Sequence, residues 1–218
     1  RRLTRLSRRR RKGNAMAQTD TIDDLIETRG TLFSEEIGAN IARDVPQQWF
    51  HWLLGAQLMS ARIAAPQAVE AAAALKGEGL HKIDAILGSY RDSRIAVLNA
   101  NGYARFDNRG ADQMHELAGQ VRDWYGDDLR RLRDEGGIRN GILKRLQDFK
   151  GIGPGGAAIF AREAQLAWDA LYPMLDKAAS GQAEKLDLPT DPDTLADRAA
   201  SPERFTRLAA ALTRAALD

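Results

Sequence analysis

Residues 146–160, LQDFKGIGPGGAAIF, decide the fold because they specify a tight turn between two helices. Gly151 and Gly153 can adopt positive φ and let other backbone approach closely, and we expect Ile152 between them to be buried. Pro154 suits the first turn of a helix, where its missing N–H is no loss. Free N–H groups at a helix N-terminus attract anions. The stretch therefore predicts a turn whose amides hold a phosphate, and the alternative is an ordinary helix–helix turn.

The rest of the chain predicts an all-α protein, because apolar residues recur at spacings of three and four while strand patterns are almost absent. Segment 47–61 is apolar on more than one face, so we expect it in the middle of the fold. The predicted helices cover residues 21–28, 47–61, 66–75, 82–90, 94–100, 108–125, 127–134, 138–149, 154–172, 176–186, 193–200 and 201–217.

The net charge of +2 is an average over two unlike parts. Residues 1–12 hold eight of the 32 Lys and Arg residues and no acidic residue, so 24 basic residues elsewhere face 30 acidic ones, a net charge of −6. This basic arm is either a nucleic-acid tail or vector-derived or upstream sequence preceding Met16. We expect residues 1–15 to be disordered and residues 16–218 to form the folded protein.

The chain contains no cysteine. Disulfides, thiolate zinc sites and iron–sulfur clusters are therefore excluded. Apolar runs are too short for a membrane span, and a secretory h-region is absent. These features predict a soluble cytoplasmic protein.

A second informative segment is residues 172–176, YPMLD. The proline stops the preceding helix, and Asp176 is left at the start of the next one, where a carboxylate is electrostatically favoured. Taken alone, Asp176 is as well explained as a structural helix cap.

Residues 146–160 and 172–176 together resemble the helix-hairpin-helix, Gly/Pro-rich loop and aspartate signature of the endonuclease III-like DNA glycosylase superfamily. The Pro-Met-Leu-Asp sequence at residues 173–176 is most similar to that of the adenine glycosylase branch. Residues 53–57, LLGAQ, are similar to the Leu-Leu-Ser-Ala-Gln stretch of endonuclease III, and residues 102–111 resemble its next internal motif. The resemblance covers residues 47–176 with order and approximate spacing preserved.

This resemblance implies two helical subdomains that flank a DNA-binding cleft and include a helix-hairpin-helix motif. Residues 47–160 would form the central subdomain, with the hairpin at 146–160, and residues 16–46 plus 161–218 the second. The implied partner is double-stranded DNA containing a damaged or mismatched base. We expect a monomer that does not bind membranes and that associates with the bacterial nucleoid when bound to DNA.

The resemblance also assigns site residues. Asp176 would be the catalytic carboxylate, which stabilises the cationic sugar formed as the glycosidic bond breaks. Gln57 would fill the gap left by a flipped nucleotide. Backbone phosphates would be held at Lys150, Gly151, Gly153 and Gly155, and a monovalent cation, Na⁺ or K⁺, could bind the hairpin carbonyls.

Two departures from the family narrow the function. Members with lyase activity carry a lysine where this chain has Gly155, so no Schiff base is expected there. The lack of cysteine removes the iron–sulfur cluster, and we expect no other cofactor. The sequence thus predicts a monofunctional base-excision glycosylase. The alternatives are a catalytically lapsed helix-hairpin-helix DNA-binding protein and a helical interaction module unrelated to DNA.

Further residues have two interpretations each. Lys144, Arg145, Lys150 and Arg162 form either a local basic patch for DNA or a solvated helix face. Trp52, Trp168 and Tyr172 either stack on a flipped base or pack the core. His51, His81 and His115 lack the spacing of metal ligands, so no metal site is expected.

Overall fold

The computed structural model describes the backbone of residues 2–218 and the side chains of residues 16–218, and over this range it contains helices and no strand. The prediction of an all-α protein is confirmed. In chain order the elements are α1 (Arg2–Arg29), α2 (Phe33–Glu36), η1 (Ile41–Arg43), α3 (Pro46–Met59), α4 (Ala65–Gly77), α5 (Ile83–Gly88), α6 (Arg91–Leu98), η2 (Asn99–Tyr103), α7 (Asp107–Tyr125), α8 (Leu129–Gly136), α9 (Arg139–Leu146), α10 (Pro154–Ala164), η3 (Asp169–Leu171), α11 (Lys177–Lys185), α12 (Pro192–Ala199) and α13 (Pro202–Leu217).

The chain forms two compact units. One combines Arg1–Leu32 with Pro173–Asp218, and the other is Phe33–Tyr172. The predicted central subdomain, 47–160, was therefore drawn too narrowly at both ends. The physical reason is that Glu163 accepts hydrogen bonds from the amides of Phe33 and Ser34 at 2.9 and 2.8 Å, which ties both flanking segments into the central unit.

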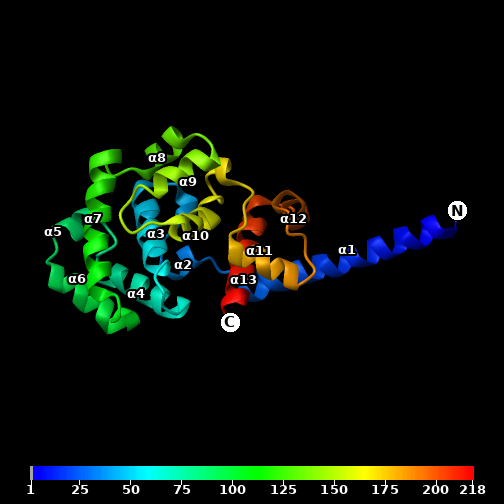
Figure 1. The fold of residues 1–218 in the computed structure, drawn as a ribbon, viewed down its shortest axis with the longest axis horizontal. Coiled ribbons are helices and arrows are strands. Elements are labelled where there is room, and N and C mark those ends of the chain that lie inside the picture. Colours follow the sequence, from blue (N-terminus) through cyan, green and yellow to red (C-terminus); the bar gives the residue numbers. More distant parts are fainter. Residues whose placement is uncertain (1) are drawn as a thin grey trace. The chain divides into compact units, whose positions relative to one another are not determined.

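Helix α3 lies in the middle of the unit 33–172, as its apolar pattern predicts. It contacts α4, α7, α8 and α10, which surround it in Figure 1. Every residue from Trp49 to Leu58 is buried. The Trp52 indole N–H donates to the Phe160 carbonyl at 3.0 Å, so even the polar edge of this ring is satisfied within the core.

The other unit is organised around α13, which contacts α1, α11 and α12. Helices α11, α12 and α13 begin at side-chain caps: Asp176 accepts from the Ala179 amide, Asp191 from the Thr194 amide and Ser201 from the Arg204 amide. A capping side chain satisfies one of the amides that a helix start leaves unpaired. Ser201 is followed by Pro202 at the first position of α13, where the missing N–H of proline is no loss.

Helix α10 ends earlier than the sequence predicts. The segment predicted as one helix over 154–172 ends at Ala164, because Trp168 folds back against Trp49 and Phe160, with ring centroids 4.6 and 5.2 Å apart. In α7, Trp124 is 47% exposed. Its ring stacks on Phe149, with centroids 5.4 Å apart and an interplanar angle of 17°.

The structure places the backbone of residues 2–15 in α1, which differs from the disorder predicted for residues 1–15. The side chains of the basic arm, residues 1–12, lie outside the described residues, and its role stays a prediction. Within the described part of the chain, no helix combines the length and apolar character that crossing a membrane requires.

Candidate nucleic-acid interface at a glycine turn

The turn between α9 and α10 requires one of its two predicted glycines, since Gly153 has φ −91°. Gly151 adopts φ +82°, and a Cβ added there would lie 2.8 Å from the Gln113 side chain and 2.9 Å from the Gln57 amide nitrogen. Both the left-handed backbone and the close approach require glycine at this position. Ile152 is 3% exposed, so the prediction that it anchors the turn in the core is confirmed.

Two glutamine side chains hold the turn in place. The Gln57 Nε2 group donates to the Lys150 carbonyl at 2.9 Å and more weakly to the Gln113 carbonyl at 3.4 Å. The Gln120 side chain accepts from the Lys150 amide at 2.8 Å. Helices α3 and α7 therefore clasp Lys150 from both its carbonyl and its amide, which makes the turn a preorganised element.

The amides that follow the clasp are left unpaired. In the part of the chain that the structure describes, the N–H groups of Gly151, Gly153 and Gly155 donate to no other residue. Gly153 and Gly155 are exposed, and no atom lies within 4 Å of a Cβ added to either of them. Helix α10 thus presents free donors and its positive dipole end to solvent, an arrangement that favours an anion.

Lys150 precedes these amides, as predicted, and Gln57 also lies next to the turn, but the two side chains differ in their exposure to solvent. The Lys150 side chain is exposed. Gln57 is 3% exposed and is engaged in the clasp, while its Oε1 atom is buried without a hydrogen bond. Gln57 thus supports the turn through its hydrogen bond, and its role of filling the gap left by a flipped nucleotide stays a prediction.

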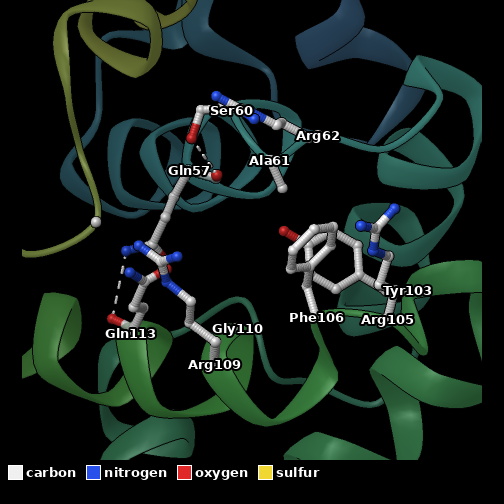
Figure 2. A pocket seen from close by; sticks show the side chains of 11 residues that line it. Gln57, Ser60, Ala61, Arg62, Tyr103, Arg105, Phe106, Arg109, Gly110 and Gln113 are labelled. Carbon is white, nitrogen blue, oxygen red and sulfur yellow. Dashed lines mark hydrogen bonds between the residues drawn. The ribbon is translucent and has the colours of Figure 1, made fainter.

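A cavity of about 480 Å³ adjoins the turn. Figure 2 shows its walls, which come from the C-terminal end of α3, the segment before α7 and the first turns of α7. The lining residues are Gln57, Ser60, Ala61, Arg62, Tyr103, Arg105, Phe106, Arg109, Gly110, Gln113 and Gly151.

Sequence reasoning did not identify this cavity. Arg105 lies in the turn before α7, and Arg109 lies in the first turn of α7. Arg62 comes from the loop after α3, far away in the sequence. Burial raises the pKa of Tyr103 to about 12, and the nearby charge of Arg109 opposes this rise. The Tyr103 hydroxyl donates to the Leu58 carbonyl at 3.1 Å, so it forms part of the cavity wall as a neutral phenol.

The predicted basic patch around the turn is wrong in one of its members. Arg162 is 2% exposed, and its guanidinium lies 5.0 Å from the centroid of the Phe33 ring and 3.8 Å from Glu163. Its position on α10 points it into the core, where it cannot reach DNA. Arg145 pairs with Glu135 at 3.1 Å, and Lys144 is exposed.

Asp176 belongs to the other unit of the chain. Its Oδ1 accepts from the Ala179 amide at 2.8 Å, which makes it the N-cap of α11, and the Thr213 hydroxyl lies 3.3 Å from the same oxygen. The carboxylate is half-buried. The structural interpretation of Asp176 as a cap is confirmed, and a catalytic role in addition to it remains a prediction.

Most of the aromatic and histidine candidates are part of the packed core. Trp52 and Trp168 are fully buried, which supports the packing interpretation for both. His51 and His81 have ring centroids 5.0 Å apart, and burial lowers the pKa of His51 to about 3. Among the described residues, no group of His, Cys, Asp or Glu side chains could hold a metal ion.

A monovalent cation at the turn would depend on backbone carbonyls. Those of Phe149, Lys150 and Gly153 already accept hydrogen bonds from Ile152, Gln57 and Ala157. Within the described chain the Gly151 and Ile152 carbonyls accept none, so these two oxygens are the ones that fit a cation.

Comparisons with protein-family models, curated proteins and solved structures give no match for this chain.

Proposed function

We propose that the protein is a monofunctional DNA glycosylase that hydrolyses the N-glycosidic bond of a flipped damaged or mismatched base in double-stranded DNA. The observation that carries this proposal is the glycine turn, with unpaired amides of Gly151, Gly153 and Gly155 at the N-terminus of α10. In the proposal, α9, the turn and α10 act as a helix-hairpin-helix motif that grips a backbone phosphate without reading sequence.

Base release in this proposal depends on Asp176. An ionised carboxylate beside the sugar stabilises the positive charge that develops as the bond to the base breaks, and it helps to orient the attacking water. The target nucleotide must leave the stack first, because its glycosidic bond is inaccessible inside the duplex. Gly155 offers no amine where a lyase would have one, so the product is an abasic site in an uncut strand.

A catalytically lapsed DNA-binding protein is the second candidate. The specific observation in its favour is that Asp176 already caps α11 and lies within reach of the Thr213 hydroxyl. Such contacts account for an aspartate at this position even in a protein without chemistry. The turn serves both candidates equally.

The experiment that separates the two is a panel of duplexes containing uracil, alkylated purines, oxidised guanine or mismatched adenine. Strand breaks that appear only after alkali treatment are the expected result, since a monofunctional glycosylase leaves the backbone intact. Binding without base release from any of these duplexes supports the second candidate. Absence of both binding and release contradicts both and leaves a helical interaction module.

Asp176→Asn tests the carboxylate itself. The amide oxygen of asparagine retains the capping interaction with Ala179, so the variant should fold and should bind an abasic-analogue duplex within about twofold of the parent. Base release should fall by at least about 100-fold, as expected when a charge-stabilising group is lost. Asp191→Asn is the matched control, because Asp191 caps α12 in the same unit through the Thr194 amide and should be dispensable for release.

A further inference from the structure

The cavity beside the turn carries positive charge that the surrounding protein does not neutralise. Arg62, Arg105 and Arg109 line it, and across the described residues none of these guanidinium groups forms an ion pair. Several other arginines of the same unit are paired: Arg130 lies 2.8 Å from Asp128, for example. Three unpaired arginines thus line a single cavity in a folded body whose net charge is negative.

The acidic residues nearest to the cavity in sequence are engaged elsewhere. Asp107 accepts hydrogen bonds from the Asn99 and Asn108 side chains at 2.7 and 2.9 Å. The Asp112 carboxylate accepts hydrogen bonds from the Arg91 guanidinium at 2.6 and 3.0 Å. Asp107 and Asp112 therefore do not neutralise the cavity arginines, and the positive charge is available to an external anion.

The size of the cavity and its aromatic wall indicate a ligand larger than a simple anion. Its volume of about 480 Å³ exceeds what a phosphate group needs. The half-buried Phe106 ring lies 5.4 Å from the guanidinium carbon of Arg105, a pair of flat surfaces of the kind on which unstacked bases are held. The Gln113 side-chain amide, which forms no hydrogen bond to a described residue, can address the edge of a base.

We propose that this cavity binds a nucleoside 5′-monophosphate, with the phosphate at Arg62, Arg105 and Arg109 and the base against Phe106. A phosphate monoester carries nearly two negative charges at neutral pH, which suits three guanidinium groups better than the single charge of an internal phosphodiester. The ligand is either the 5′-phosphorylated end of a DNA strand or a free mononucleotide. The inference rests on the proposed function in one respect, namely that the ligand is a nucleic acid component.

The test compares lesion-free single strands that differ only in a 5′-phosphate or a 5′-hydroxyl, with binding followed by fluorescence anisotropy of a 3′-labelled strand. The full chain should bind the phosphorylated strand at least about tenfold more tightly, because charge-assisted hydrogen bonds to Arg are strong. Arg105→Ala and Arg109→Ala should each remove most of this preference. Titration with dAMP, and with inorganic phosphate as the minimal probe, then separates the two sources: tight binding of dAMP identifies a mononucleotide site, and binding of the strand end alone identifies a DNA-end site.

Arg43→Ala is the control, because Arg43 is exposed in the same unit and lies outside the cavity. It should keep the preference for the 5′-phosphate. Equal affinity for the two strands, or a preference that survives both cavity variants, overturns the proposal. Since no lesion is present and no base release is measured, an inactive glycosylase with an intact 5′-phosphate preference leaves this inference standing, whereas an active glycosylase without the preference refutes it alone.

Discussion

Replacing Gly151 with alanine tests whether the turn is built as its geometry indicates. A non-glycine residue in the left-handed region costs about 1–2 kcal/mol, and Gly151 has φ +82°. The added methyl group would also lie 2.9 Å from Gln57 Nε2, which must then give up its hydrogen bond to the Lys150 carbonyl. That bond is worth about 1 kcal/mol. We therefore expect Gly151→Ala to lower the free energy of unfolding by about 2–3 kcal/mol.

Gly155→Ala is the matched control on the same turn. Gly155 lies in the first turn of α10, and no atom is within 4 Å of its added Cβ. Because alanine is a better helix former than glycine, this substitution should stabilise the protein by about 0.5 kcal/mol. The two variants thus make the same chemical change and should shift stability in opposite directions.

Urea unfolding followed by tryptophan fluorescence measures this difference in the relevant unit. All four tryptophans, Trp49, Trp52, Trp124 and Trp168, belong to the unit 33–172, so the signal reports on the part of the chain that contains the turn. If the two variants unfold within about 0.5 kcal/mol of each other, the backbone strain and the glutamine clasp do not have the energies assigned to them. The turn is then not a preorganised element.

Three further predictions concern stability. Burial lowers the pKa of His51 to about 3, whereas the unfolded chain binds this proton near pH 6.5, so stability is lost as the pH falls through this window. Between pH 7 and pH 5, protonation of His51 in the unfolded chain should lower the free energy of unfolding by about 2 kcal/mol. Urea unfolding at the two pH values should show that this decrease is absent in His51→Gln and present in the control His115→Gln, whose side chain is exposed on α7. Glu163→Ala should cost about 3 kcal/mol, because the buried amides of Phe33 and Ser34 lose their acceptor; an unchanged thermal unfolding midpoint would contradict this. Asp176→Ala should cost about 1 kcal/mol by removing the cap of α11, while Asp176→Asn should cost less than about 0.5 kcal/mol; urea unfolding followed by circular dichroism tests whether the two variants differ in this order.

Much of the helical framework could be predicted because its signals are local. Pro46, Pro154 and Pro202 stand at or next to predicted helix starts, and each begins a helix in the structure. The apolar pattern of α3 predicted its central position. The end of α10 was missed because Ala164 carries no stop signal: the helix ends where packing of Trp168 against Trp49 and Phe160 outweighs its continuation.

The candidate interface was predicted only in part. The turn itself follows from spacing that the residues reveal, whereas its position beside Gln57 depends on packing between segments that are 93 residues apart. The burial of Arg162 could not be foreseen, because charged residues at helical spacing are compatible with either face of a helix until its neighbours are known. The sequence also could not show that Arg62, Arg105 and Arg109 line one cavity, because they come from two separated segments of the chain.

By itself, the sequence determined that the chain is helical, where most helices begin, and that a glycine turn with free amides separates α9 from α10. These features depend on interactions between residues a few positions apart, such as caps, proline at a first turn and glycine at positive φ. Only the tertiary structure decided that Gln57 and Gln120 clasp the turn, that Arg162 faces the core and that three unpaired arginines share one cavity. The reason is physical: which face of a helix meets which neighbour is settled by packing between distant segments, and that packing is not encoded in any short stretch of the chain.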